Sequence, residues 1–247
     1  MLSNIWDVVL YQPLLNALAA LVSVIPGGDV GIAVVILTIL VKIILFPLSQ
    51  RSIESQAKMT LLAPELNKIK ASGVSKEEQA RLTFELYKKH KANPFSGCLL
   101  VLIQIPIIFA LYYVFSREIN FGSGLLYSFM HVPEQINMMF LGLIDISQKS
   151  FILAVLAGAS QYFQALFMPK PASSGITPGS FGESFSKSMN MQMKYIFPFV
   201  IFVFLGTNWF GVSLSGAVAL YWITGNVFMI GQQIYVDKKR EDLVIKL

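Results

Sequence analysis

The stretch DVGIAVVILTILVKIILFPLSQ, residues 29–50, decides the fold class of this chain. Between Asp29 and Arg51 it carries a single charge, Lys42. A helix needs roughly 20 consecutive apolar residues to cross the hydrocarbon core of a membrane, and this stretch is long enough. We therefore predict a membrane-spanning helix at residues 30–49 that has a lysine in its interior.

Further uncharged stretches predict four more spans. Residues 92–116, 150–169 and 195–236 contain no charged side chain. The last stretch would measure about 63 Å as one helix, roughly twice the hydrocarbon thickness. It must therefore turn back, and the glycines, asparagine and serines at 206–216 mark the turn. The additional spans are predicted at residues 94–116, 150–168, 194–209 and 213–236.

The composition of the whole chain agrees with this division. Of the 247 residues, 55% are hydrophobic and 13% are charged, whereas a soluble domain has typically about 25% charged residues. A disordered chain is excluded, and an ordinary soluble globular protein is disfavoured. The predicted fold is an all-α integral membrane protein with a bundle of five transmembrane helices.

The first segment, residues 1–28, is apolar but interrupted by Asp7, Gln12, Pro13 and Asn16. Pro13 would break a helix near its middle. We therefore expect an amphipathic helix that lies at the membrane interface; the alternative is a sixth span. The segment lacks the basic start of a secretory signal peptide.

The basic residues predict the orientation of the chain. Sixteen of the 19 lysines and arginines fall in or next to residues 50–93, 169–193 and 237–247. Because cytoplasmic loops are enriched in basic residues, these segments are predicted to be a cytoplasmic hairpin, a flexible cytoplasmic loop and a cytoplasmic tail. Residues 117–149 are then extracytoplasmic or interfacial. The N-terminus lies outside the cell and the C-terminus inside.

The polar segment 50–93 predicts two helices, at 53–71 and 76–91. Ser75 followed by Glu78 is the pattern of an N-terminal capping box. The segment is longer than a simple connection requires, which favours a docking role, while the alternative is a solvated charged surface. The docking candidates are the basic residues Arg51, Lys58, Arg81, Lys88 and Lys89.

Lys42 is the residue that the fold alone does not explain. A lysine in mid-span costs roughly 2.5–3.5 kcal/mol on insertion scales, and its distance of about 13 Å to Arg51 along the helix disfavours snorkelling. The other predicted spans contain no Asp or Glu. They do contain amides, so we predict a hydrated polar cavity around Lys42; helix packing is the alternative role for each amide. The amides are Gln104, Gln161, Gln164, Asn226, Gln232 and Gln233.

Motifs for enzymatic chemistry are absent from the sequence. One cysteine, Cys98, and two separated histidines cannot form an intramolecular disulfide or a Cys/His metal site. No nucleophile–histidine–acid set and no glycine-rich phosphate loop stands out. The chain is therefore predicted not to be an enzyme and to hold no cofactor and no metal. The net charge of +5 is explained by membrane orientation, so specific recognition of a nucleic-acid sequence is not expected.

Three stretches carry a family resemblance: LTILVKIILFPLSQRSIESQAKM at 37–59, NPFSGCLLVLIQIPIIFALYYVF at 93–115 and LSGAVALYWITGNVFMIGQQ at 214–233. They resemble the YidC family of membrane protein insertases in its bacterial short form, which is related to mitochondrial and thylakoid insertases. The resemblance implies a multi-pass protein of the bacterial cell membrane that inserts and folds other membrane proteins. The implied partners are nascent membrane proteins, lipids, the ribosome and the Sec translocation channel.

The resemblance also implies a hydrophilic groove that opens to the cytoplasm and to lipid. Lys42 lies where the family usually has arginine, and Gln164 and Trp222 lie where groove-lining residues are similar. The groove residues predicted from residues and resemblance together are Lys42, Gln104, Gln164, Trp222 and Asn226.

Two other functions remain open at this stage. The first is a small anion channel or transporter that uses Lys42 as its binding charge. The second is an assembly chaperone that holds membrane helices without inserting them.

Overall fold

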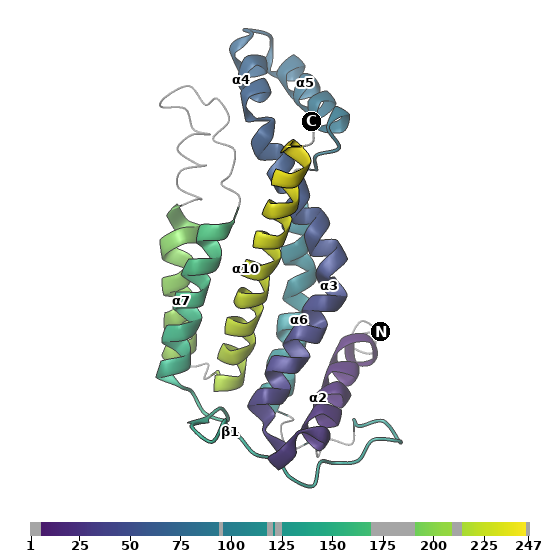
Figure 1. The fold of residues 1–247 in the computed structure, drawn as a ribbon, viewed down its shortest axis with the longest axis vertical. Helices are drawn as coiled ribbons and strands as arrows, with labels where there is room; N and C mark the ends of the chain where they lie inside the picture. Colours follow the sequence, from purple (N-terminus) through teal and green to yellow (C-terminus); the bar gives the residue numbers. More distant parts are fainter. Residues whose placement is uncertain are drawn as a thin grey trace.

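The computed structural model describes residues 6–93, 96–117, 121, 125–168, 191–208 and 214–245. The fold is helical, with one short β-hairpin (Figure 1). In chain order the elements are the π-helical turn η1 (Asp7–Tyr11), α2 (Gln12–Val24), the 3₁₀ turn η2 (Pro26–Gly28), α3 (Val30–Leu61), α4 (Ala63–Ala71), α5 (Lys76–Lys89), α6 (Ser96–Arg117), β1 (Met139–Phe140), β2 (Ile144–Asp145), α7 (Phe151–Phe167), the π-helical turn η3 (Gln192–Ile196), α9 (Phe197–Gly206) and α10 (Gly216–Ile245).

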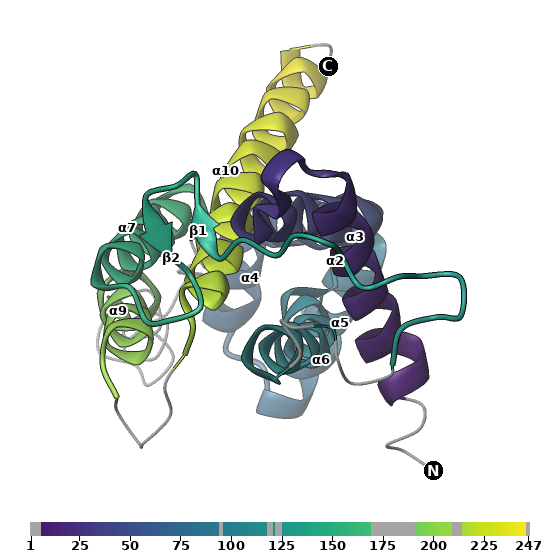
Figure 2. The ribbon, with the colours of Figure 1, turned by 90° about the horizontal axis from the view of Figure 1, so that it is seen from below.

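α10 connects two groups of helices (Figure 2). On one side it packs against α3, which also packs against α2 and α6. On the other side it packs against α7, which packs against α9. Residues that follow one another on α10 therefore face different neighbours, and this property arranges the polar side chains described below.

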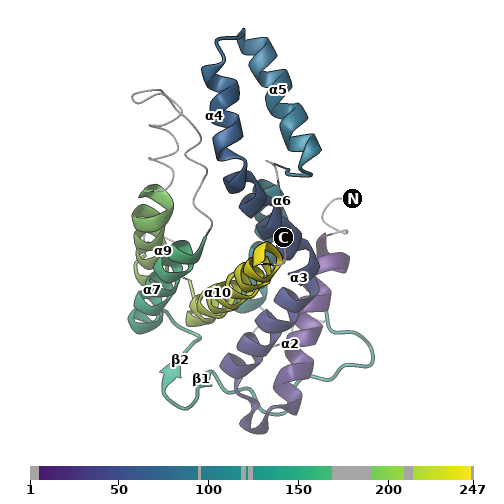
Figure 3. The ribbon, with the colours of Figure 1, turned by 45° about the horizontal axis from the view of Figure 1, so that its top comes forward.

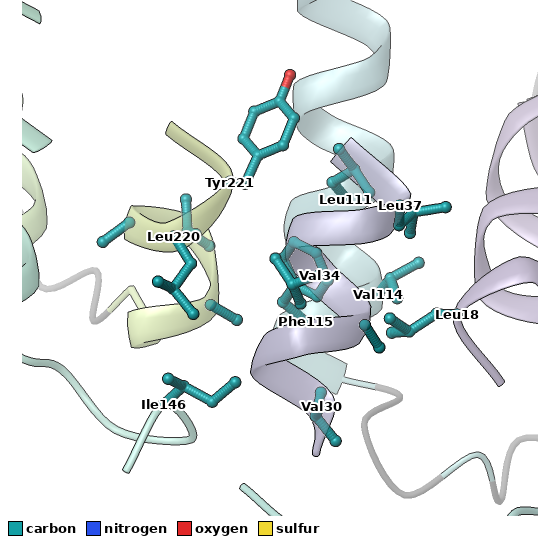
Figure 4. Packing of buried hydrophobic residues seen from close by; sticks show 14 of the residues in the cluster. Leu18, Val30, Val34, Leu37, Leu111, Val114, Phe115, Ile146, Leu220 and Tyr221 are labelled. Atoms are coloured by element: carbon teal, nitrogen blue, oxygen red, sulfur yellow. The ribbon is translucent and has the colours of Figure 1, made fainter. Parts of the chain in front are cut away.

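The core lies between α2, α3, α6 and the first turns of α10, and it extends to α7 and α9 (Figure 4 shows part of it). Leu18, Val34, Val114 and Phe115 are among its fully buried side chains. Tyr221 is at the edge of this cluster, and its hydroxyl points away from the apolar residues. The apolar core thus ends where the polar site begins.

Many large apolar side chains face outward from the helices. Ile44 is 74% exposed, Phe151 64% and Phe199 61%. By length and composition, Asp7–Val24 and Val30–Gln56 could each cross a membrane, and Leu102–Phe115, Phe151–Phe167 and Gln192–Gly206 are shorter apolar helices. Outward apolar surface of this extent is unfavourable in water and favourable in lipid.

The prediction that Pro13 breaks the first helix is wrong. The chain is helical from Asp7 to Val24, because the π-helical turn η1 leads directly into α2, where Pro13 occupies the first turn. Proline lacks an N–H and crowds the carbonyl four residues earlier, and a π-helical turn displaces that carbonyl. Pro198 follows η3 in the same way. Whether α2 spans the membrane or lies at its interface stays a matter of prediction.

The boundary after the first long helix also differs from the expectation. The first hairpin helix was expected at residues 53–71, but α3 continues through Pro47 to Leu61 and α4 begins at Ala63. Pro64 explains the break, since it lacks the N–H and crowds the carbonyl four residues earlier, whereas proline is tolerated in the first turn of a new helix. Leu62 has φ −80° and ψ −4°, which changes the direction of the chain.

α4 and α5 form a hairpin that lies beyond the ends of the other helices (Figure 3). Its small core consists of Leu62, Leu66, Leu86 and Ala92. The predicted N-cap of α5 is confirmed, because Ser75 Oγ accepts a hydrogen bond of 3.2 Å from the backbone N–H of Glu78.

The segment at 125–150 lies at the end of the molecule opposite the α4–α5 hairpin (Figure 1). The carboxylate of Asp29 accepts hydrogen bonds from the N–H groups of Ile32 (3.0 Å) and Leu141 (2.8 Å). The carbonyl of Gln148 accepts from the N–H of Gly216 at 2.7 Å. These contacts attach the segment to the first turns of both α3 and α10.

Two further predicted boundaries concern the C-terminal half. The tail predicted at residues 237–247 is helical as far as Ile245, because no proline or glycine interrupts α10 there. The flexible loop predicted at 169–193 falls mostly outside the described residues, and its last residues, from Met191, are helical.

Candidate functional site

Lys42 lies on α3 and turns toward α6 and α10. Its Nζ donates a hydrogen bond of 3.3 Å to Oε1 of Gln104 on α6. Within the described part of the chain, no carboxylate oxygen comes within 4.0 Å of this Nζ. A lysine ammonium has three donors, so the single amide acceptor leaves most of its hydrogen-bonding capacity and its full charge uncompensated.

Two residues of α10 complete the surroundings of Lys42. The amide nitrogen of Gln104 donates to the hydroxyl of Tyr221, whose side chain is 4% exposed. One turn later, a Cβ at Gly225 would lie only 3.3 Å from Cε of Lys42. We call Lys42, Gln104 and Tyr221 the charged cluster; it joins α3, α6 and α10.

A second, neutral group lies between α10 and α7. The indole N–H of Trp222 donates to Oε1 of Gln161 at 2.8 Å, and Nε2 of Gln161 donates to Oε1 of Gln164 at 3.0 Å. Asn226 donates to Oγ of Ser160 at 2.9 Å. We call these five residues the amide cluster.

The structure therefore divides the predicted groove residues between two faces of α10. Tyr221 and Gly225 face Lys42, whereas Trp222 and Asn226 face α7, because residues four apart share a helix face. Lys42 and Gln104 are in direct contact; Gln164, Trp222 and Asn226 belong to the amide cluster. Among the described residues no hydrogen bond joins the two clusters.

Tyr221, Gly225 and Ser160 were not among the residues predicted for the site. Tyr221 and Gly225 could have been found from their spacing of four residues and their place beside the Trp222–Asn226 pair. Ser160 directly precedes Gln161, but its role depends on which face of α7 meets α10.

Gln232, for which helix packing was the alternative to a place in the polar cavity, is buried between helices. Its amide nitrogen donates to Oγ of Ser49 at 2.6 Å and to the carbonyl of Phe46 at 3.3 Å. These contacts join α10 to α3 beside Pro47, where proline removes a helical donor. Gln232 therefore has a packing role in this chain.

The five predicted docking residues are all exposed. Arg51 and Lys58 were predicted in the hairpin, but they lie in the C-terminal part of α3, because that helix continues to Leu61. Arg81 differs from the others because it forms ion pairs with Glu78 (2.6 Å) and Glu85 (3.2 Å). The hydrogen bond from Arg81 lowers the pKa of the Glu78 carboxyl, and Glu78 in turn raises the pKa of Arg81. The charge of Arg81 is thus compensated within α5, which leaves Arg51, Lys58, Lys88 and Lys89 as the better docking candidates.

Comparison with known proteins identifies the family. The family model described as 60Kd inner membrane protein matches residues 21–242. Membrane protein insertase YidC of Clostridium tetani is 33% identical over 217 residues, which cover 86% of this chain and 84% of the relative. The chain belongs to the YidC family of membrane protein insertases. The corresponding insertase of Fusobacterium nucleatum is 32% identical over 216 residues, or 86% of this chain and 88% of the relative.

Other relatives of the family are longer. The insertase YidC of Wolinella succinogenes is 34% identical over 216 residues, which cover 87% of this chain but 34% of the relative. A solved structure described as an active YidC insertase with its first transmembrane domain resolved has a TM-score of 0.50 and 24% identity, covering 82% of this chain and 40% of that chain. This likeness supports the fold.

Proposed function

We propose that the chain is a membrane protein insertase in which the ammonium of Lys42 attracts acidic groups of an incoming polypeptide. One observation carries the proposal. Lys42 has a single amide acceptor at 3.3 Å and, among the described residues, no carboxylate within 4.0 Å. An opposite charge supplied by a substrate would be the missing partner. The similar proteins described above are named membrane protein insertases, which supports this function.

The proposed membrane arrangement has α3, α6, α7, η3 with α9, and α10 as the five spans. The basic hairpin of α4 and α5 and the C-terminal end of α10 lie at the same end of the molecule (Figure 1). The segment that holds Lys149 lies at the other end. This separation of basic residues supports a cytoplasmic hairpin and C-terminus.

In the proposed mechanism, a hydrophilic groove open to the cytoplasm and to lipid receives the polar tail of the substrate. The charged cluster and the amide cluster supply its polar lining on the two faces of α10. A tail that reaches Lys42 has a shorter apolar path to cross. The apolar segment of the substrate then moves into lipid, driven by removal of its surface from water. No covalent step is needed.

The test is insertion by the purified chain in proteoliposomes. The substrate is a small single-span protein with an acidic translocated tail, compared with the same protein whose tail carries asparagine or glutamine in place of the acidic residues. We expect Lys42→Ala to lower insertion of the acidic substrate at least tenfold and Lys42→Arg to retain it, because arginine preserves the charge.

Lys149→Ala is the matched control, because Lys149 also donates to an amide oxygen, that of Asn208, but lies in the segment at the far end of the molecule. It should insert both substrates like the parent chain. Equal insertion of the acidic substrate by Lys42→Ala and Lys149→Ala would contradict the role of the charge. Saturable flux of a small anion without any polypeptide would favour a channel instead.

The proposed role of the hairpin is to dock the ribosome or the Sec translocation channel on the cytoplasmic side. The exposure of Arg51, Lys58, Lys88 and Lys89 supports it. Because such contacts involve exposed charges, binding should weaken as salt rises. Replacing these four residues with glutamine should remove the salt dependence, while Arg81→Gln should change it little.

A further inference from the structure

The position of the Lys42 ammonium needs an explanation beyond its hydrogen bond to Gln104. A long lysine side chain in an apolar helix gains by extending its charged end toward water. One amide contact of 3.3 Å is a weak restraint against that movement. Something else must hold the side chain between α3, α6 and α10.

The first restraint is the orientation of the Gln104 amide. An ammonium can only donate hydrogen bonds, so the carbonyl oxygen of Gln104 must face Lys42. The amide nitrogen then faces α10, where the hydroxyl of Tyr221 accepts from it. Without this hydroxyl the half-buried amide loses its acceptor, and rotation of the Gln104 side chain would also remove the oxygen from Lys42.

The second restraint is the space beside Gly225. A Cβ at this position would lie 3.3 Å from Cε and 3.8 Å from Nζ of Lys42. The first distance is closer than ordinary contact, so even an alanine here would require the end of the lysine side chain to shift from its present position. Because Tyr221 and Gly225 are four residues apart, they face Lys42 together.

We propose that Tyr221 and Gly225 are positioning residues that hold the ammonium of Lys42 inside the bundle. Tyr221 does so by orienting the Gln104 amide, and Gly225 by leaving room for the last atoms of the lysine side chain. The consequence for substrate choice rests on the proposed function. The depth of the positive charge then determines how strongly an acidic tail is favoured over a neutral one.

The direct test measures the position of Lys42 without any substrate. The purified chain in lipid nanodiscs is treated with a water-soluble amine-acetylating reagent, and the rate of modification at Lys42 is followed by mass spectrometry of its peptide. Tyr221→Phe should raise this rate about two- to tenfold, the range that corresponds to loss of one hydrogen bond. Gly225→Ala should also raise it, because the end of the lysine side chain must move from its present position. The rates at Lys149 and Lys194 should not change.

Two variants of the same helix serve as matched controls. Gly231→Ala adds a Cβ where no atom lies within 4 Å, and Tyr235→Phe removes a hydroxyl from a side chain that is 54% exposed. Neither should alter the rate at Lys42. An unchanged or lower rate in both Tyr221→Phe and Gly225→Ala would overturn the positioning role, whatever the function of the chain.

The second measurement connects position to substrate choice. Tyr221→Phe and Gly225→Ala should lower the preference for the acidic over the neutral substrate about two- to tenfold, and they should have no further effect in the Lys42→Ala background. A merely structural role would lower insertion in both backgrounds and would overturn the inference. A raised labelling rate with unchanged preference would uphold the positioning and contradict the proposed function.

Discussion

α10 presents a charged cluster to α3 and α6 and a neutral amide cluster to α7. In the amide cluster, polar groups satisfy one another: Gln161 both accepts from Trp222 and donates to Gln164. In the charged cluster, the ammonium of Lys42 has one amide oxygen as its hydrogen-bond acceptor among the described residues. The difference indicates that the amide cluster stabilises the bundle, whereas the charged cluster retains capacity for an external partner.

The largest expected effect follows from removing the charge while keeping the volume. Lys42→Met should raise the free energy of unfolding by about 1–3 kcal/mol, because a charge without a carboxylate partner is replaced by an apolar side chain. The same variant should lose about tenfold or more of the preference for an acidic substrate. Unfolding in mixed detergent and insertion in proteoliposomes measure the two effects. A loss of stability would contradict the distinction between the clusters.

The amide cluster should respond in the opposite way. Gln161→Ala leaves the half-buried indole N–H of Trp222 without its acceptor, so the free energy of unfolding should fall by about 1–3 kcal/mol. The ratio of acidic to neutral substrate inserted should stay the same, because the charge is intact. The same two assays apply, and a change in that ratio larger than twofold would show that the two clusters act together.

A smaller effect is expected at the other hydrogen bond of the amide cluster. Ser160→Ala removes the acceptor of Asn226, which should lower the free energy of unfolding by about 1 kcal/mol. Ser160→Thr keeps a hydroxyl and serves as the conservative variant in the same unfolding assay. Equal loss in both variants would point to packing of α7 against α10 rather than to the hydrogen bond.

The smallest effect concerns the hairpin, outside both clusters. The pKa of Glu78 is lowered by its hydrogen bond to Arg81, so the pair stabilises α5 above the ordinary carboxyl pKa, and this contribution is lost as pH falls through the lowered value. Hydrogen exchange at the α5 amides should therefore be slightly faster in Glu78→Gln than in the parent near neutral pH. The difference should disappear in acid, once the pH has fallen below the lowered pKa of Glu78. A difference that persists in acid would contradict the ion-pair explanation.

The sequence alone was enough to predict most of the helices and to identify Lys42 as the unusual residue of the site. Lys42 stands out because a charge interrupts an apolar stretch, and Gln104, Gln164 and Asn226 stand out as amides in the same environment. Trp222 was predicted as a groove residue because of the family resemblance. These signals are local, so they can be recognised before the helices are placed in space.

The remaining features depend on how helices face one another. Tyr221 and Trp222 face two different sides of α10 because of the rotation of that helix against α3 and α7. The hydropathy of the sequence does not predict this rotation. Pro13 was expected to break a helix, and a π-helical turn accommodates it. The break before Pro64 could have been predicted, since proline disrupts a helix interior but is tolerated in the first turn of a helix.

A charge exchange between protein and substrate tests the central claim most directly. The purified Lys42→Glu variant is reconstituted, and insertion is compared for one substrate with either an acidic or a lysine-containing translocated tail. The account predicts that the parent favours the acidic tail and that Lys42→Glu favours the lysine-containing tail. An unchanged preference for the acidic tail in Lys42→Glu would contradict a direct attraction between Lys42 and the incoming polypeptide.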